Sequence, residues 1–71
     1  MISKKFWQQL FGERLKEERY RYCMTLQELA DNLGVSAMRL KEFEEGSLCP
    51  SAYTIYKLTK IFPSVDFLNH G

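Results

Sequence analysis

The 71-residue chain is poor in the residues that build metal and disulfide sites. It has one histidine, His70, and two cysteines, Cys23 and Cys49, which stand far apart and form no C-x-x-C pair. Zinc sites and redox motifs need closely spaced ligands, so we expect no metal, no cofactor and two reduced structural thiols. The chain also lacks a glycine-rich phosphate loop and a nucleophile with a plausible histidine partner, which argues against an enzyme.

Long apolar runs and linkers are also absent. No apolar run approaches the roughly 18 residues needed to cross a bilayer, and residues 1–10 lack the features of a signal peptide. We therefore expect a cytoplasmic protein with no membrane partner. Because no glycine-, serine- or proline-rich stretch divides the chain, residues 1–71 are expected to form one domain with an N-terminal extension over residues 1–10. The apolar fraction of 45% is sufficient for a core without disulfides or metal.

Residues 25–46 have the pattern of two short helices joined by a tight turn. Thr25 and Glu28 make a capping box at the start of the first helix. Apolar residues follow at helical spacing, and Gly34 is suited to the left-handed conformation that ends a helix. Ser36 caps the second helix. The window therefore predicts a helix-turn-helix motif.

The second helix of this motif, over about residues 37–45, has two distinct faces. Its inward stripe consists of Leu40, Phe43 and Glu44 at helical spacing. The opposite, outward face carries Ala37, Met38, Lys41, Glu42 and Glu45.

Three further helices are predicted outside the motif, so the fold class is all-α with five helices. The first begins at a cap near Ser3 and ends near Cys23, and the fourth follows the cap Ser51 and is stopped by Pro63. The last is a short turn of helix over residues 64–68. The buried side of the first helix is expected to consist of Leu10, Phe11, Leu15, Glu18, Arg19 and Tyr22. That of the fourth helix is expected to consist of Ile55, Leu58, Thr59 and Phe62.

Four segments resemble the lambda-repressor-like (Cro/repressor-type, XRE) helix-turn-helix proteins. GERLKEERYRY at 12–22 is similar to the family's first helix, MTLQELADNLGVS at 24–36 to its second helix and turn, RLKEFEEG at 39–46 to the end of its recognition helix, and PSAYTIYKLTKIF at 50–62 to its fourth helix. The segments occur in the family's order over nearly the whole chain. The resemblance implies a compact five-helix domain that binds double-stranded DNA.

Arg19 falls on the apolar face of the first helix, and Glu44 falls on the apolar face of the third. Burying either charge alone is expensive, so we expect a buried ion pair that ties the two helices together. The resemblance implies the same pair. The alternative is that both side chains extend outward to solvent.

By the resemblance, the helix over residues 37–45 enters the major groove, and its early residues meet base edges. The base-reading positions then fall on Ala37, Met38 and Glu42, with Arg39 and Lys41 beside them. Ala and Met pack on a thymine methyl, Glu accepts from a cytosine amino group, and Arg or Lys donates to guanine. The alternative is that Met38 is merely an exposed helix residue on a solvated charged face.

Phosphate contacts are expected from the two helix starts and the loop after the motif, at Leu26, Gln27, Ser36 and Ser47. The family often has Gln where this chain has Leu26. Between Leu26 and Pro50 the chain has two basic and five acidic residues, and its net charge is only +1. Strong affinity for duplex DNA therefore needs basic residues from elsewhere. The candidates are Lys4, Lys5, Arg14, Lys16 and Arg21.

These observations favour a sequence-specific DNA-binding transcriptional regulator of the phage Cro/repressor type. The alternative is a helix-turn-helix scaffold that binds a regulatory protein, as an antirepressor, modulator or antitoxin-like partner does. Apolar residues at the start of the chain either cover its own core, meet such a partner, or form a homodimer together with residues near the other end. The interface candidates are Phe6, Trp7, Leu10, Phe11, Phe67 and Leu68, with Tyr53 and Tyr56 as further ones.

Overall fold

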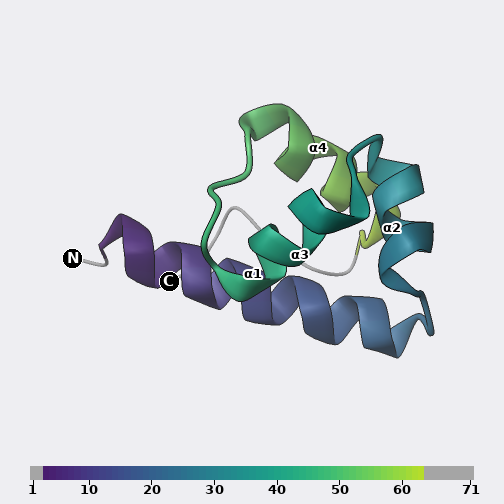
Figure 1. Cartoon of the computed structure of the whole chain (residues 1–71), viewed down its shortest axis with the longest axis horizontal. Helices are drawn as coiled ribbons and strands as arrows, with labels where there is room; N and C mark the ends of the chain where they lie inside the picture. Colours follow the sequence, from purple (N-terminus) through teal and green to yellow (C-terminus); the bar gives the residue numbers. More distant parts are fainter. Residues whose placement is uncertain (1–2, 64–71) are drawn as a thin grey trace.

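The computed structural model describes residues 3–63, which form four helices joined by turns and loops (Figure 1). The helices are α1 (Lys4–Arg21), α2 (Leu26–Leu33), α3 (Ala37–Glu45) and α4 (Ala52–Ile61). The all-α prediction is confirmed for this part of the chain. The short fifth helix expected over residues 64–68 lies outside the described residues, and so do the interface candidates Phe67 and Leu68.

Each helix begins at the cap that the sequence predicts. The side-chain oxygens of Ser3, Ser36 and Ser51 each accept the backbone N–H three residues later, at 3.1, 3.1 and 3.2 Å. Thr25 and Glu28 make both bonds of the capping box, at 3.1 and 2.8 Å. Since these bonds satisfy N–H groups that have no acceptor within the helix, four local patterns determine where the helices start.

Each of the first three helices is followed within two residues by a residue in the left-handed conformation. Gly34 follows α2 with φ of 72°, and Gly46 follows α3 with φ of 78°. Helix α1 ends at Arg21, slightly before the predicted end, and Tyr22 is its C-cap. The next residue, Cys23, has φ of 56° although it is not glycine. A side chain in this conformation is strained, because its Cβ approaches the backbone carbonyl.

Helix α3 is at the centre of the fold, because it packs against both α1 and α2, while α4 packs against α2 (Figure 1). Most of the predicted buried positions are buried. Thr59 is only half-buried, and Leu10 and Tyr22 are exposed over 38% and 47% of their surface, because they flank the core instead of facing it. The buried apolar residues are Phe11, Leu15, Leu29, Ala30, Leu33, Leu40, Phe43, Ile55, Leu58 and Phe62.

The crossing of α1 over α3 depends on Gly12. A Cβ atom added at this buried glycine would lie 2.5 Å from the carbonyl oxygen of Glu44 and would also collide with the carbonyl oxygen of Phe43. Both obstacles are backbone atoms, which cannot swing aside. The absence of a side chain therefore lets the two helix backbones touch, and this contact sets the depth at which α3 sits on α1.

Within the N-terminal extension expected over residues 1–10, residues 4–10 belong to α1, which runs without a break from Lys4. Its first turns reach beyond the other helices (Figure 1). Trp7 is half-buried and stacks on Phe11 with ring centroids 5.2 Å apart. Phe11 is 4% exposed, so its inclusion among the interface candidates is wrong: it is a core residue. Phe6 and Leu10 remain 50% and 38% exposed.

Candidate nucleic-acid interface

The turn between α2 and α3 is held by local hydrogen bonds. The N–H of Val35 reaches back over Gly34 to the carbonyl oxygen of Ala30 at 3.0 Å, which closes the end of α2. Ser36 then caps the start of α3, because its hydroxyl oxygen accepts a hydrogen bond from the backbone N–H of Arg39. The hydroxyl proton of Ser36 is not used in that bond, so it can be donated to a phosphate oxygen.

Lys57 of α4 supports the same turn from outside the motif. Its Nζ donates a hydrogen bond of 3.0 Å to the carbonyl oxygen of Leu33, which is the last residue of α2. The same Nζ lies 4.7 Å from the centre of the Tyr53 ring. A cation at a helix C-terminus is favourable because it faces the negative end of the helix dipole. The sequence gives no sign of this role, because only the folded arrangement brings α4 to the end of α2.

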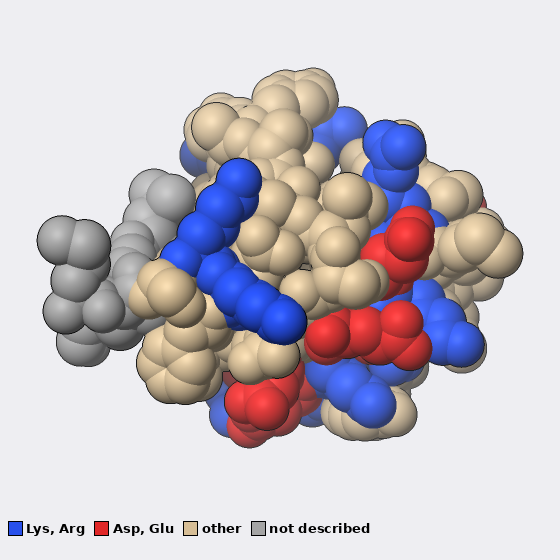
Figure 2. All heavy atoms as spheres, turned by 60° about the vertical axis from the view of Figure 1, so that its left-hand side comes forward, with Lys and Arg blue, Asp and Glu red and all other residues tan. Residues whose placement is uncertain are grey.

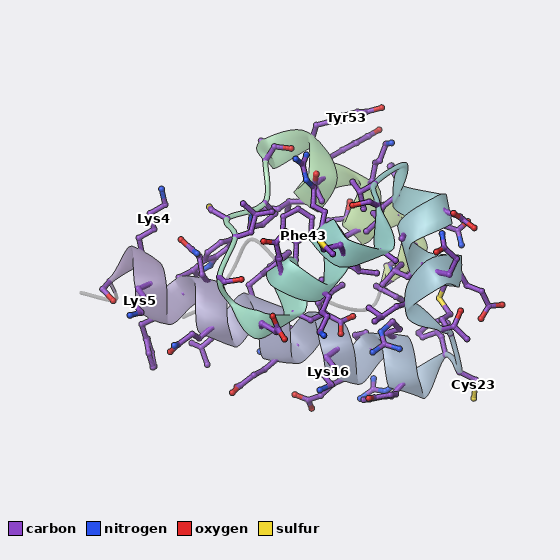
Figure 3. The ribbon with its side chains drawn as sticks, in the orientation of Figure 1. Lys4, Lys5, Lys16, Cys23, Phe43 and Tyr53 are labelled. Atoms are coloured by element: carbon purple, nitrogen blue, oxygen red, sulfur yellow. The ribbon has the colours of Figure 1, made fainter. Side chains whose placement is uncertain are left out.

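Helix α3 divides into a buried and an exposed face as predicted. Leu40 and Phe43 are 0% and 3% exposed and pack into the core, and Figure 3 shows Phe43 pointing in between the helices. Met38 lies on the other face with 75% of its surface exposed. Ala37 is only half-exposed and packs against the core. The remaining base-reading candidates Arg39, Lys41 and Glu42 are exposed.

Arg19 and Glu44 form a buried, two-pronged ion pair between α1 and α3. Nε of Arg19 donates to Oε2 of Glu44 at 2.7 Å and Nη2 donates to Oε1 at 3.1 Å. The remaining Nη1 donates to the carbonyl oxygen of Met24 at 3.0 Å. The hydrogen bonds to Glu44 raise the pKa of Arg19 above its ordinary value, although burial opposes this shift. One side chain thus fixes α3 to α1 and to the turn that precedes α2.

The phosphate candidates on α2 and in the loop after α3 have partners within the chain. Gln27 donates its side-chain amide to Asp31 at 2.8 Å, and the hydroxyl of Ser47 donates to the carbonyl oxygen of Glu42 at 3.2 Å. Leu26 is half-buried against the core. The group that Leu26 can offer to a phosphate is therefore its backbone N–H, which lies in the first turn of a helix and has no intrahelical acceptor.

Basic side chains border the exposed face of α3. Lys16 of α1 and Lys41 of α3 line a shallow hollow, together with Tyr20 and Glu45. Neither Arg39 nor Lys41 has a side-chain ion pair within residues 3–63, so both cations are available to an outside anion. Figure 2 shows basic side chains across the front of one face, with acidic side chains to the right and below.

Other kinds of site find no support in the described part of the chain. No three His, Cys, Asp or Glu side chains in it come together in a way that would hold a metal ion. None of its helices is long and apolar enough to span a bilayer. Cys23 and Cys49 are exposed free thiols.

The comparison with known families decides the classification. The profile of a family described as helix-turn-helix matches residues 15–68, about three quarters of the chain. The chain belongs to this helix-turn-helix family. Its members are DNA-binding domains of the XRE/Cro/C1 type, which confirms the resemblance, and they are transcriptional regulators and not enzymes.

One relative has the same motif in a longer protein. The chain is 38% identical over 63 residues to a Bacillus subtilis (strain 168) protein named "SPbeta prophage-derived uncharacterized HTH-type transcriptional regulator YonR". The alignment covers 87% of this chain and 58% of that protein, so the chain spans little more than half the length of this relative. No solved structure matches the chain at a significant level.

Proposed function

We propose that this helix-turn-helix chain is a sequence-specific DNA-binding transcriptional regulator that places α3 in the major groove. The observation that carries the proposal is the division of α3: its apolar stripe is buried, and Met38, Arg39, Lys41 and Glu42 are presented on an exposed face. The Arg19–Glu44 pair and the Gly12 crossing hold α3 rigidly, which is what base recognition requires of a reading helix.

The exposed face of α3 has a defined chemistry for base edges. Met38 offers an unbranched apolar side chain to a thymine methyl group, and the Glu42 carboxylate accepts a hydrogen bond from a cytosine amino group. Arg39 and Lys41 donate to guanine or to phosphate oxygens. Since Ala37 is half-buried, its contact with a base would be limited to the exposed part of its methyl group.

A second candidate function, docking of a regulatory protein or of a second copy, is favoured by two exposed apolar side chains on α1. Phe6 and Leu10 are 50% and 38% exposed. In addition, the segment from Leu26 to Pro50 has more acidic than basic residues, which opposes binding to phosphate. In this case α3 would be a scaffold element, and its exposed face would be covered by protein.

The experiment that tests DNA binding is a fluorescence-anisotropy titration of random-sequence duplex DNA at two salt concentrations. The wild type is expected to bind, and its affinity should fall steeply with salt, because Lys and Arg release counterions from the phosphates. The Arg39→Glu, Lys41→Glu double variant should lose most of this affinity. A Lys60→Glu variant on α4, which makes half of that change in net charge, shows how much affinity is lost when the charge is altered away from α3.

Two results would contradict the proposal. One is equal binding by the wild type and the Arg39→Glu, Lys41→Glu variant. The other is no binding by the wild type at low salt while circular dichroism shows intact helices. Sedimentation of the wild type would then test for a homodimer.

If DNA binding holds, selection from a random duplex library gives the operator, and changes at Met38 or Glu42 should alter the preferred bases.

A further inference from the structure

The first turns of α1 lie outside the region that the family profile matches. The profile begins at residue 15, whereas α1 begins at Lys4. Residues 3–12 contain two lysines and no acidic residue. This charge balance is opposite to that of the segment from Leu26 to Pro50, which has two basic and five acidic residues.

These turns are anchored to the loop that follows the reading helix. The side-chain amide of Gln8 donates to the carbonyl oxygen of Gly46 at 3.3 Å. A Cβ atom added to Gly46 would lie 3.0 Å from the Cα atom of Gln9, so the two backbones are in close contact. Trp7 stacks on Phe11 within the same helix and packs against the hydrophobic core, which is a third point at which these turns meet the rest of the fold. Gln8 and Gln9 are therefore held beside Gly46, one residue before the phosphate candidate Ser47, and the first turn of α1 extends beyond this contact.

Lys4 and Lys5 are the charged groups that this anchoring positions. Both are exposed, and neither has an ion pair or a side-chain hydrogen bond among residues 3–63. Figure 3 shows their side chains leaving the first turn of α1 in different directions, Lys4 toward the side on which the loop after α3 rises and Lys5 away from it. Figure 2, with this end of the molecule turned forward, shows basic side chains across its front.

We propose that the first turn of α1 is a second DNA contact, in which Lys4 binds a backbone phosphate beyond the edge of the groove that α3 enters, and Lys5, which leaves the helix on the other side, adds positive charge to the same turn. The proposal rests on the proposed function. The contact supplies the positive charge that the segment from Leu26 to Pro50 lacks. It comes from a part of the chain that precedes the region matched by the family profile. The contact is to phosphate, so it adds affinity for any sequence and leaves base preference to α3.

The test compares the Lys4→Ala, Lys5→Ala double variant with the wild type in the same anisotropy titration, over a series of salt concentrations. Alanine is a better helix former than lysine, and a cation in the first turn is unfavourable to the helix dipole, so the double variant should keep α1 intact. Circular dichroism checks this. The matched control is Lys60→Glu on α4, which lowers the net charge by the same amount.

The double variant is expected to bind more weakly than the wild type. The slope of log K against log salt should become shallower by about 0.9, because each neutralised phosphate contributes about 0.9 and Lys4 is the lysine that faces the side of the loop after α3. Lys60→Glu should leave that slope unchanged. The emission of Trp7, the single tryptophan of the chain, gives an independent readout one turn from Lys4. It should change when DNA binds the wild type, and this change should be lost in the double variant.

The outcomes separate this inference from the function on which it rests. If the Arg39→Glu, Lys41→Glu variant loses binding but the Lys4→Ala, Lys5→Ala variant keeps the wild-type slope, α3 binds DNA and the first turn of α1 does not. If Lys60→Glu weakens binding as much as the double alanine variant, the effect is one of net charge and the local contact is wrong. If the wild type shows no salt-sensitive binding, the proposed function and this inference both fail.

Discussion

At the scale of single residues, the structure depends most on the ion pair between Arg19 and Glu44. The two side chains are only 8% and 5% exposed, so neither charge is stabilised by water when its partner is removed. We expect Glu44→Gln and Arg19→Met each to lower the free energy of unfolding by about 3 kcal/mol, as for other broken buried pairs. Urea unfolding followed by circular dichroism measures these changes.

A double-mutant cycle shows whether that loss comes from the pair itself. The Arg19→Met, Glu44→Gln double variant should be destabilised by much less than the sum of the single changes, because it leaves no charge buried alone. The exposed Glu42→Gln is the control and should change stability by no more than about 0.5 kcal/mol. If the single effects simply add, the two side chains do not interact and their proximity contributes nothing to stability.

The pair was predictable from the sequence, whereas two other single residues were not. A charge at a position that helical spacing assigns to the core signals a partner, and both Arg19 and Glu44 stand at such positions. Gly12 gives no comparable signal, because a glycine within a helix has several explanations and only the packed structure reveals the carbonyl groups beside it. The same holds for Lys57, whose role depends on where α4 lies relative to the end of α2.

At the scale of helices, the junction between α1 and α2 contains a strained residue that invites a stabilising change. Cys23 is exposed and has φ of 56°, a conformation that costs L-residues roughly 1 kcal/mol or more. Figure 3 shows its side chain pointing away from the helices. Replacing it by glycine should raise stability by about 0.5 kcal/mol, because the relief of strain exceeds the added entropy of the unfolded chain.

The other cysteine provides a matched control for this prediction. Cys49 is also exposed, but its φ is not positive, so Cys49→Gly gains no relief of strain and should lower stability. Thermal unfolding of both variants gives the comparison. A melting temperature for Cys23→Gly at or below that of the wild type would show that the left-handed conformation at this position is not a significant cost.

Helix starts were easier to predict than helix ends, for a physical reason. Each start depends on a side chain that bonds to a backbone group three residues away, so Ser3, Thr25, Ser36 and Ser51 could be identified from adjacent sequence. The end of α1 depends on Cys23, a residue with no preference for the left-handed conformation. The exposed face of α3 was predicted from its spacing, but the burial of Ala37 depends on contacts with the rest of the fold.

At the scale of the whole molecule, the question is whether the first turns of α1 fold together with the rest of the described domain. Trp7 reports on these turns alone, because it is the single tryptophan of the chain. Its packing against the core and the bond from Gln8 to Gly46 connect the turns to the core and to the end of α3. Small domains with such connections unfold in one cooperative step.

We therefore expect the urea transition of Trp7 emission to coincide with the transition of the helical circular dichroism signal, in midpoint and in slope. Leu15→Ala in the core should shift both transitions equally to lower urea, by an amount that corresponds to about 3 kcal/mol. An earlier transition of Trp7, unmoved by Leu15→Ala, would mean that the start of α1 frays independently. In that case Lys4 and Lys5 would not be held beside the loop after α3, and a phosphate contact there would cost the ordering of the turns that carry them.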